Sequence, residues 1–419
     1  MAGLLQDTPL IGNEIPWLRQ LRQDGRSAFA AAGVPTAKTE AWKYTKPREL
    51  GADDFVIAQS VDDLSWSADL PFDCYQIRFE NGFFSPEDSD LPQGVELVPL
   101  IEAAMFRTDA RNRLGKLANI EKYPFAALNQ AYVNEGVYIK IDNNVELKKP
   151  LVIISHTTPG ADNLFFNLRN LIVLGENSAA TVVEYHSWSG ELKSRYFANI
   201  VNEVYLASGA RFHHYKLQNE AYKADHISLT VAAVERDAQY EGFCLQRGAN
   251  LSRNETLVKL LSEGASAEVN AAYVMNGWAT LDTTTDIEHL SSCTTSHQLV
   301  KGVVGGDAKG VFQGKIHIAP NAIKTEGTQL HKALLLTDTA EVDVKPELEI
   351  FADDVKCSHG AASGELDEEQ LFYMRSRGIG LDEAKQILID AYLDEVIAKI
   401  GNEKIREWIK LWAKANHTA

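Results

Sequence analysis

The feature that most restricts the fold is a long succession of short β-type segments that begins at about Gly136 and continues to Ser363. Segments such as Val137–Ile141 and Leu171–Leu174 are rich in β-branched and aliphatic residues, as strands are. Long helical patterns do not intervene between them. Because parallel strands of an alternating α/β sheet are joined by crossover helices, that class of fold is excluded and a mainly β core is predicted.

A small-residue turn recurs between these strands and gives the core an internal repeat. The turn ends in Ala six times, at successive intervals of 31, 28, 27, 43 and 32 residues. A strand-and-turn repeat of about 30 residues predicts a solenoid, because one coil cannot bury its inner face without neighbours. The interval of 43 predicts a degenerate turn or an insertion. The turns are Asn177–Ala179, Ser208–Ala210, Arg236–Ala238, Glu263–Ala265, Gly306–Ala308 and Asp338–Ala340.

The simplest such solenoid is a parallel β-helix. The hexapeptide repeat of left-handed β-helices is missing, so we predict the right-handed form. A β-sandwich is the alternative, since its strands also recur with regular turn signals.

Helical patterns flank the core on both sides. Asn13 is expected to cap a first helix with Pro16 in its first turn, and further helices are expected over 100–117 and 125–132. After the core, apolar residues at helical spacing predict helices that either cap the solenoid or present an apolar stripe to a partner. We divide the chain into an N-terminal mixed helical domain (1–135), a parallel β-helix core (136–363) and a C-terminal helical domain (364–419).

The composition excludes several classes of partner. The 419 residues carry 41 Lys and Arg against 58 Asp and Glu, a net charge of −17, which disfavours binding to nucleic acid or anionic membranes. No apolar run reaches the ~20 residues that span a bilayer, and the first residues lack the pattern of a secretory signal. Four widely spaced cysteines do not form a disulfide framework. We therefore expect a cytoplasmic protein.

Enzyme motifs are missing from the sequence. Gly302–Gly306 lacks the Gly-Lys-Ser/Thr ending of a nucleotide loop, and there is no nucleophile elbow, Cys-x-x-Cys pair or zinc-protease motif. The most suggestive segment is Asp353–Gly360, where Cys357 and His359 would point to one face of a strand. A thiolate beside an imidazole suits iron or zinc, but two ligands do not complete a site. The alternative is a packed cysteine beside a surface histidine.

Two further motifs are open to a structural explanation. Arg375 and Arg377 bracket Ser376 and suit an anion, but they also fit a helix end that is capped by Gly378. The adjacent pair His213 and His214 would point to opposite faces of a strand, which disfavours a shared metal.

The segment Glu349–Ala361, followed by Asp367–Ile379, closely resembles the C-terminal signature of SufD, in the SufB/SufD family of iron–sulfur cluster assembly scaffolds of the SUF system. The segments Glu40–Thr45 and Phe125–Asn129 resemble the N-terminal motifs of that family. The resemblance extends over nearly the whole chain. It implies a right-handed parallel β-helix between helical domains and a non-catalytic scaffold subunit.

The resemblance also implies partners and cargo. It implies a heterodimer with the paralogue SufB through the β-helices, with docking of the ATPase SufC, which supplies ATPase activity, on the C-terminal helices. A nascent iron–sulfur cluster or iron would be shared with SufB and not held tightly by this chain alone, and a homodimer would be possible in isolation. His359 is the preferred ligand candidate, with Cys357 in the same segment, and Tyr373 and Arg377 would support the interface. The apolar residues expected to dock the ATPase are Ile387, Tyr392, Trp408 and Trp412.

Two alternatives stay open. One is a SufB-like paralogue, which is disfavoured because Thr328–His331 has no cysteine where SufB members carry one. The other is a β-helix enzyme that acts on polysaccharide, but no regular acidic ladder recurs in the repeats.

Overall fold

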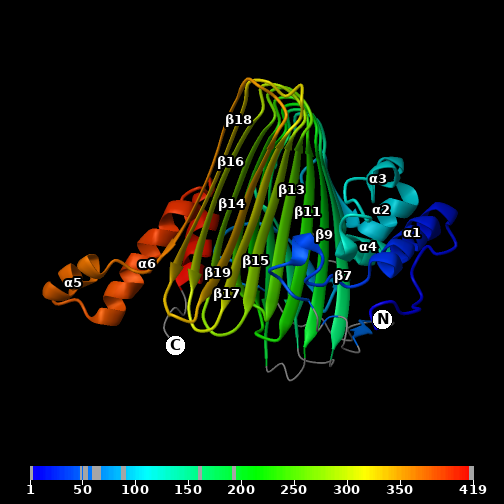
Figure 1. Cartoon of the computed structure of the whole chain (residues 1–419). Helices are drawn as coiled ribbons and strands as arrows, with labels where there is room; N and C mark the ends of the chain where they lie inside the picture. Colours follow the sequence, from blue (N-terminus) through cyan, green and yellow to red (C-terminus); the bar gives the residue numbers. More distant parts are fainter. Residues whose placement is uncertain are drawn as a thin grey trace.

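The core of the computed structural model is a parallel β-solenoid, and the structure describes residues 3–47, 50, 55–58, 68–85, 91–158, 163–190 and 195–414. Eight coils succeed one another along its axis in this part of the chain, and each coil gives one strand to each of two sheets (Figure 1). The predicted fold class, a mainly β solenoid with helices at both ends, is confirmed.

Strands of successive coils pair in parallel, so side chains at paired positions lie on the same face. The first sheet, called sheet A, contains β5 (Val137–Ile141), β7 (Leu164–Leu174), β9 (Tyr196–Leu206), β11 (Ala224–Val234), β13 (Leu251–Leu260), β15 (Thr280–His289), β17 (Lys309–Ile318) and β19 (Glu341–Ile350). The second, called sheet B, contains β6 (Leu151–Thr157), β8 (Ala179–Trp188), β10 (Arg211–Glu220), β12 (Gln239–Gly248), β14 (Ser266–Met275), β16 (Thr295–Val304), β18 (Thr325–Leu335) and β20 (Val355–Gly364).

One corner of the solenoid explains most of the sequence repeat. Where sheet A passes to sheet B, the turns of seven coils each hold a residue with positive φ, a conformation that Gly, Asn and Asp adopt most easily. The N–H of each of these residues donates to a carbonyl of the next coil, which stacks the turns. The seven residues are Asn144, Asn177, Gly209, Asp237, Gly264, Cys293 and Lys324.

The interval of 43 residues arises from two causes. The degenerate turn that it predicts exists at Cys293, which is followed by Thr294 in place of Ala. The last two Ala turns, however, follow β16 and β18, so they belong to the opposite corner, where sheet B passes to sheet A. The Ala-to-Ala intervals in the sequence therefore combine turns from two different corners of the solenoid.

The N-terminal region closes the first coil. Its strand β2 (Tyr75–Glu80) pairs in parallel with β6, and β4 (Val95–Pro99) pairs antiparallel with β5, so both sheets continue beyond the coils. The short strands β1 (Val56–Ile57) and β3 (Phe83–Ser85) pair with β7 and β2. The helices are α1 (Pro16–Ala32), the 3-10 turn Glu40–Trp42, α2 (Leu100–Phe106), α3 (Thr108–Arg113) and α4 (Pro124–Ala131).

Two expectations for this region are wrong in detail. The cap of α1 is Ile15 and not Asn13, although Pro16 does occupy the first turn. The single helix expected over 100–117 is two helices, because Arg107 has an extended backbone and its side chain bonds Glu96 at 2.7 Å. The third helix is α4, close to its expected place.

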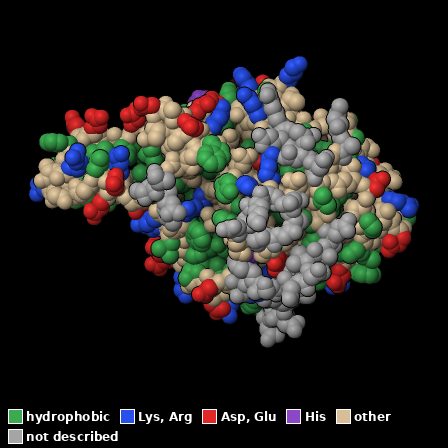
Figure 2. Space-filling model, turned by 90° about the horizontal axis from the view of Figure 1, so that it is seen from below, with side chains coloured by type: hydrophobic (Ala, Val, Ile, Leu, Met, Phe, Trp, Pro, Cys, Tyr) green, Lys and Arg blue, Asp and Glu red, His purple; other side chains and the backbone are tan. Residues whose placement is uncertain are grey.

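The C-terminal helices are α5 (Glu368–Ser376), α6 (Leu381–Ile397) and α7 (Glu403–Lys414). Helices α6 and α7 pack their apolar faces on the outer face of sheet B, while α5 projects away from the solenoid (Figure 1). Figure 2 shows this projecting end at the left, with hydrophobic, basic and acidic side chains together on its surface. Among the described residues no helix has the length and apolar character needed to cross a membrane.

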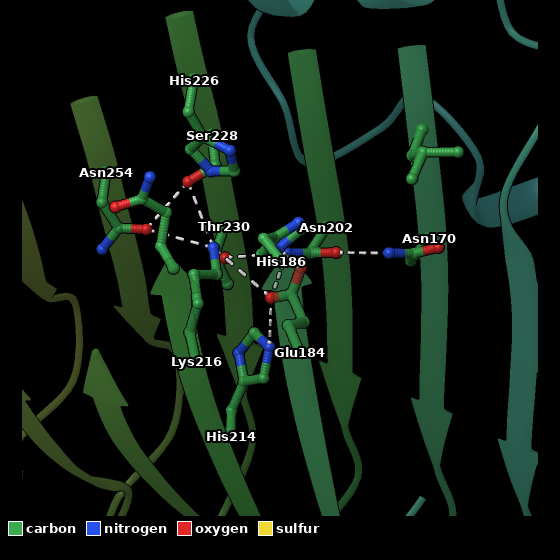
Figure 3. A network of polar contacts seen from close by, with 12 residues as sticks. Asn170, Glu184, His186, Asn202, His214, Lys216, His226, Ser228, Thr230 and Asn254 are labelled. Atoms are coloured by element: carbon green, nitrogen blue, oxygen red, sulfur yellow. Dashed lines mark hydrogen bonds and ion pairs between the residues drawn. The ribbon is translucent and has the colours of Figure 1, made fainter. Parts of the chain in front are cut away.

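The lumen of the middle coils is polar. Lys216 lies 3.4 Å from Glu184 and donates to Ser228 and Asn254 on the opposite sheet, both at 3.1 Å (Figure 3). His214 bonds the same Glu184 oxygen at 2.8 Å. Burial opposes ionisation of Glu184, but Lys216 and the two neighbouring histidines hold its pKa well below the usual value. The network joins the two sheets inside the solenoid, and His213 points outward, as its position next to His214 predicts.

Candidate functional site at the open end of the solenoid

The last coil is open. Within the described residues, β19 pairs only with β17 and β20 only with β18, so one edge of each strand has no strand partner. Most residues of β20 are exposed or half-buried. A long unpaired edge is a template for pairing with another chain, and proteins normally cover or blunt it. Pro346 lies within β19, which agrees with an edge position since proline cannot donate to a ladder.

Cys357 and His359 both face the lumen. In-register pairs connect Lys216 through Cys244, Ala271, Val300 and His331 to Ala361, so alternate residues of β20, including Cys357 and His359, share the inward face. The prediction that the two side chains lie on one face of a strand is confirmed. They nevertheless differ in accessibility, because His359 is exposed and Cys357 is half-buried.

Cys357 has the environment of a packed cysteine. It lies against the small apolar cluster of Ile316, Ile318 and Ala352 beside Gly327. Burial raises the pKa of its thiol above the usual value. A thiol binds metal as the thiolate, so a metal at Cys357 would have to displace a proton that burial holds on the sulfur. His359 is the accessible donor of the pair.

Sequence reasoning missed the residues beneath His359. Gln329 pairs in register with His359, and Gln298 pairs with Gln329 one coil deeper. His331, two residues along β18, is buried and bonds the hydroxyl of Tyr273 at 2.8 Å. A signal was available, because polar residues at every second position of a predicted solenoid strand either face solvent or build a polar lumen.

Tyr373 and Arg377 lie on and just after α5. The guanidinium of Arg377 donates to the Tyr373 hydroxyl at 3.0 Å and lies 5.1 Å from the centre of its ring. Both side chains stand on the surface of the projecting helix. Gly378 has φ of +88° after the helix, so the sequence-based expectation of a glycine cap is confirmed.

The four residues expected to dock the ATPase lie in two environments. Trp408 is 6% exposed and packs edge-on against Tyr185, with the centres of the two rings 5.2 Å apart. Trp412 and Tyr392 are half-buried beside Arg247 and Lys301 of the solenoid. Only Ile387 of the four is largely accessible, at 43%. The structure adds Phe372 of α5, which is 74% exposed and which the sequence pattern did not single out.

The open end does not hold a complete metal site. Across the part of the chain that the structure describes, no three His, Cys, Asp or Glu side chains are arranged to hold a metal ion. Metal bound at His359 would therefore need ligands other than the described His, Cys, Asp and Glu residues of this chain.

The fold and the site define a class of protein: a β-solenoid that is closed at one end and carries an accessible histidine at its other, open end. The family model described as the SufBD core domain of SUF system FeS cluster assembly matches residues 156–392. The model described as the SufBD protein N-terminal region matches residues 6–153. The chain belongs to the SufBD family, which takes part in iron–sulfur cluster assembly.

Similar proteins agree with this assignment. An iron–sulfur cluster assembly SufBD family protein of Synechocystis is 32% identical over 96% of this chain and 91% of its own length. The iron–sulfur cluster assembly protein SufD of Escherichia coli is 31% identical over 90% of this chain and 88% of its own. The protein of the same name from Bacillus subtilis is 27% identical over 75% of this chain and 72% of its own.

Proposed function

We propose that this chain is a SufD-like, non-catalytic scaffold subunit that works in the cytoplasm with a SufB paralogue and the ATPase SufC. Membership of the SufBD family and the relatives named SufD support this proposal. The observation that carries it is the open end of the solenoid, where unpaired strand edges lie beside an accessible histidine. An iron–sulfur cluster is the cargo of this scaffold and not its resident cofactor.

The unpaired edges of β19 and β20 are the proposed contact with SufB. Edge strands bind a second chain through main-chain hydrogen bonds, and exposed apolar side chains add affinity. Phe351, in the turn between the two strands, is 60% exposed and supplies such a side chain. The same edges would pair two copies of this chain when SufB is absent, which gives the homodimer.

The projecting C-terminal arm is the proposed contact with SufC. Phe372 and Ile387 are accessible, and no side chain of α5 is fully buried. Trp408 and Trp412 hold the arm on sheet B, so their part in docking is indirect. Tyr373 and Arg377 support the surface of the same arm.

His359 is the proposed ligand of the nascent cluster. Its imidazole lies at the rim of the lumen, where a partner that pairs with β20 would bring its own side chains close. The thiolate would come from SufB, because the pKa of Cys357 is raised by burial and its thiol is protonated near neutral pH. Cys357 then serves mainly as packing beside the ligand.

Anaerobic purification of the tagged chain from its own cells tests the partners, and His359→Ala tests the site. We expect the SufB paralogue and the ATPase to co-purify with the unmodified chain and with the His359→Ala variant. Iron and acid-labile sulfide in the complex should fall several-fold in His359→Ala. His297→Ala is the matched control, because His297 is exposed on β16, away from the unpaired edges, and bonds the Thr328 hydroxyl at 2.8 Å. Equal iron and sulfide in all three complexes would contradict the proposed ligand, and recovery of the chain without either partner would contradict the scaffold.

A further inference from the structure

We infer that Gln329 is a positioning residue, which holds the imidazole of His359 in the tautomer and orientation that bind iron. This inference rests on the proposed role of His359 and assigns a function to a residue one coil below it.

Gln329 lies directly beneath His359 in the lumen. The two residues are paired in register on β18 and β20, whose backbones are about 4.8 Å apart as in any sheet. Their side chains therefore leave the same face of sheet B and cross the lumen in adjacent layers. The Gln329 amide reaches the opposite sheet, since a Cβ added to Gly314 of β17 would lie only 1.8 Å from its Nε2. Gly314 thus leaves the space that this extended side chain occupies.

The amide of Gln329 has unused hydrogen-bonding capacity. Its side chain is 2% exposed, and in the described part of the chain neither Oε1 nor Nε2 has a hydrogen-bond partner. A buried amide without partners is destabilising, and leucine of similar size would avoid that penalty. The imidazole in the layer above is the group in register that can take up this capacity.

The layer below favours one orientation of the amide. The hydroxyl of Thr285 donates to Oε1 of Gln298 at 2.6 Å, which leaves Nε2 of Gln298 as the free donor of that layer. A donor below Gln329 favours the amide orientation that turns Oε1 toward it, and a carbonyl oxygen has two lone pairs. The second lone pair can accept the ring N–H of His359.

This contact has a defined chemical effect. A metal-binding histidine commonly donates its other ring N–H to an acceptor, which fixes the tautomer and makes the ligand nitrogen more basic. With Oε1 of Gln329 as that acceptor, the remaining nitrogen of His359 presents its lone pair to iron. Loss of such a contact lowers metal affinity by about 10–100-fold in comparable sites.

Iron binding to the anaerobic complex of the full chain with its partners tests the inference, with Fe²⁺ as the probe. Gln329→Leu keeps the size of the side chain and removes both polar atoms, while Gln329→Glu keeps an acceptor oxygen. We expect Gln329→Leu to lower Fe²⁺ affinity by about 10–100-fold and Gln329→Glu to restore most of it. The pH midpoint of Fe²⁺ binding should move downward in Gln329→Leu, because an imidazole without its acceptor is less basic.

The stability of the Gln329→Leu variant distinguishes a positioning role of Gln329 from a structural one. We expect the melting temperature of Gln329→Leu to be unchanged or higher, because a buried amide without partners is replaced by hydrocarbon. Unfolding of Gln329→Leu would overturn the inference, since the amide would then hold the core together. Wild-type affinity and pH midpoint in Gln329→Leu, with His359→Ala defective, would also overturn it and leave the proposed function intact. Wild-type iron binding in His359→Ala would overturn both.

Discussion

The two ends of the solenoid are built in opposite ways. At the N-terminal end, β2 and β4 extend both sheets beyond the first coil, and the antiparallel β4 ends the run of parallel pairing in sheet A. At the C-terminal end, β19 and β20 stop with unpaired edges within the described residues, and the helices that follow pack on the outer face of sheet B instead. The N-terminal end thus finishes in short antiparallel strands, β3 and β4, of 3 and 5 residues, which blunt a sheet edge. The C-terminal end finishes in two 10-residue parallel strands, and it resembles half of an interface.

The difference shows that the C-terminal end of the solenoid is left, in the described part of the chain, without strands that cover its last coil. Unpaired edges invite aggregation, and a chain that closes one end with its own strands has the means to close both. The open end also carries the accessible His359 and the half-buried Cys357, whereas charged groups deeper in the lumen are paired. The proposed function therefore places stability and assembly at separate locations along one axis, and the predictions below test that separation.

The largest expected effect lies near the closed end. Arg169 and Glu203 form a buried ion pair at 2.9 Å, and Glu203 also accepts backbone N–H bonds from the 115–118 loop. Arg169→Met should lower the free energy of unfolding by about 3–5 kcal/mol, because it leaves a buried carboxylate without its cation. Urea denaturation measures this change.

The matched control lies near the open end. Lys315 and Glu349 form an ion pair at 2.7 Å, but both side chains are partly exposed. Lys315→Met should change stability by less than about 1 kcal/mol, as surface ion pairs do. Equal effects of the two substitutions would show that the two ends do not differ in the way described.

Acidification is expected to act on buried histidines of the core. Burial lowers the pKa of His289 and of His331 to about 4, against about 6.5 in the unfolded chain. Each histidine must stay neutral in the folded state, so its contribution to the free energy of unfolding is fully present above pH 6.5. This contribution is lost as the pH falls from 6.5 to 4, by up to about 1.4 kcal/mol per pH unit. His331→Gln should flatten the profile of unfolding free energy against pH in this window. An unchanged slope would mean that His331 is not kept neutral by the fold.

The smallest effect on stability is expected on the projecting arm. Phe372→Ser should leave the unfolding free energy within about 0.5 kcal/mol, because the side chain is exposed. If the arm docks SufC as proposed, the expected effect is weaker capture of that ATPase, measured by pull-down with purified SufC. Trp408→Ser is the contrasting variant. Because Trp408 is buried against sheet B, its loss should destabilise the packing of α6 and α7. Undiminished capture by Phe372→Ser would place the docking surface elsewhere.

The solenoid was predictable because its turns need special residues. Five of the seven positive-φ corner positions hold Asn, Asp or Gly, and the positions repeat with the coil in the sequence. The strands β2 and β4 were not predicted, because a short segment that completes a sheet has no repeat and pairs through backbone groups that any sequence provides.

The site was predictable in part for a related reason. Cys357 and His359 stand two residues apart, and a strand places them on one face whatever its neighbours are. Gln329 is thirty residues away along the chain, and it comes beneath His359 only through the length of the intervening coil. Amphipathic helices are ambiguous in another way, because an apolar stripe such as that of Trp408 and Trp412 fits the chain's own sheet as well as a partner.

The most direct test of the two-ended design is amide hydrogen exchange of the chain, diluted until any homodimer dissociates, and of its complex with the proposed partner SufB. We predict that amides on the unpaired edges of β19 and β20 exchange rapidly in the isolated monomer and become protected in the complex, while β2, β4 and the first coils show little change. Protection that falls on the N-terminal strands, with β19 and β20 unchanged, would contradict the claim that the open end is the assembly surface.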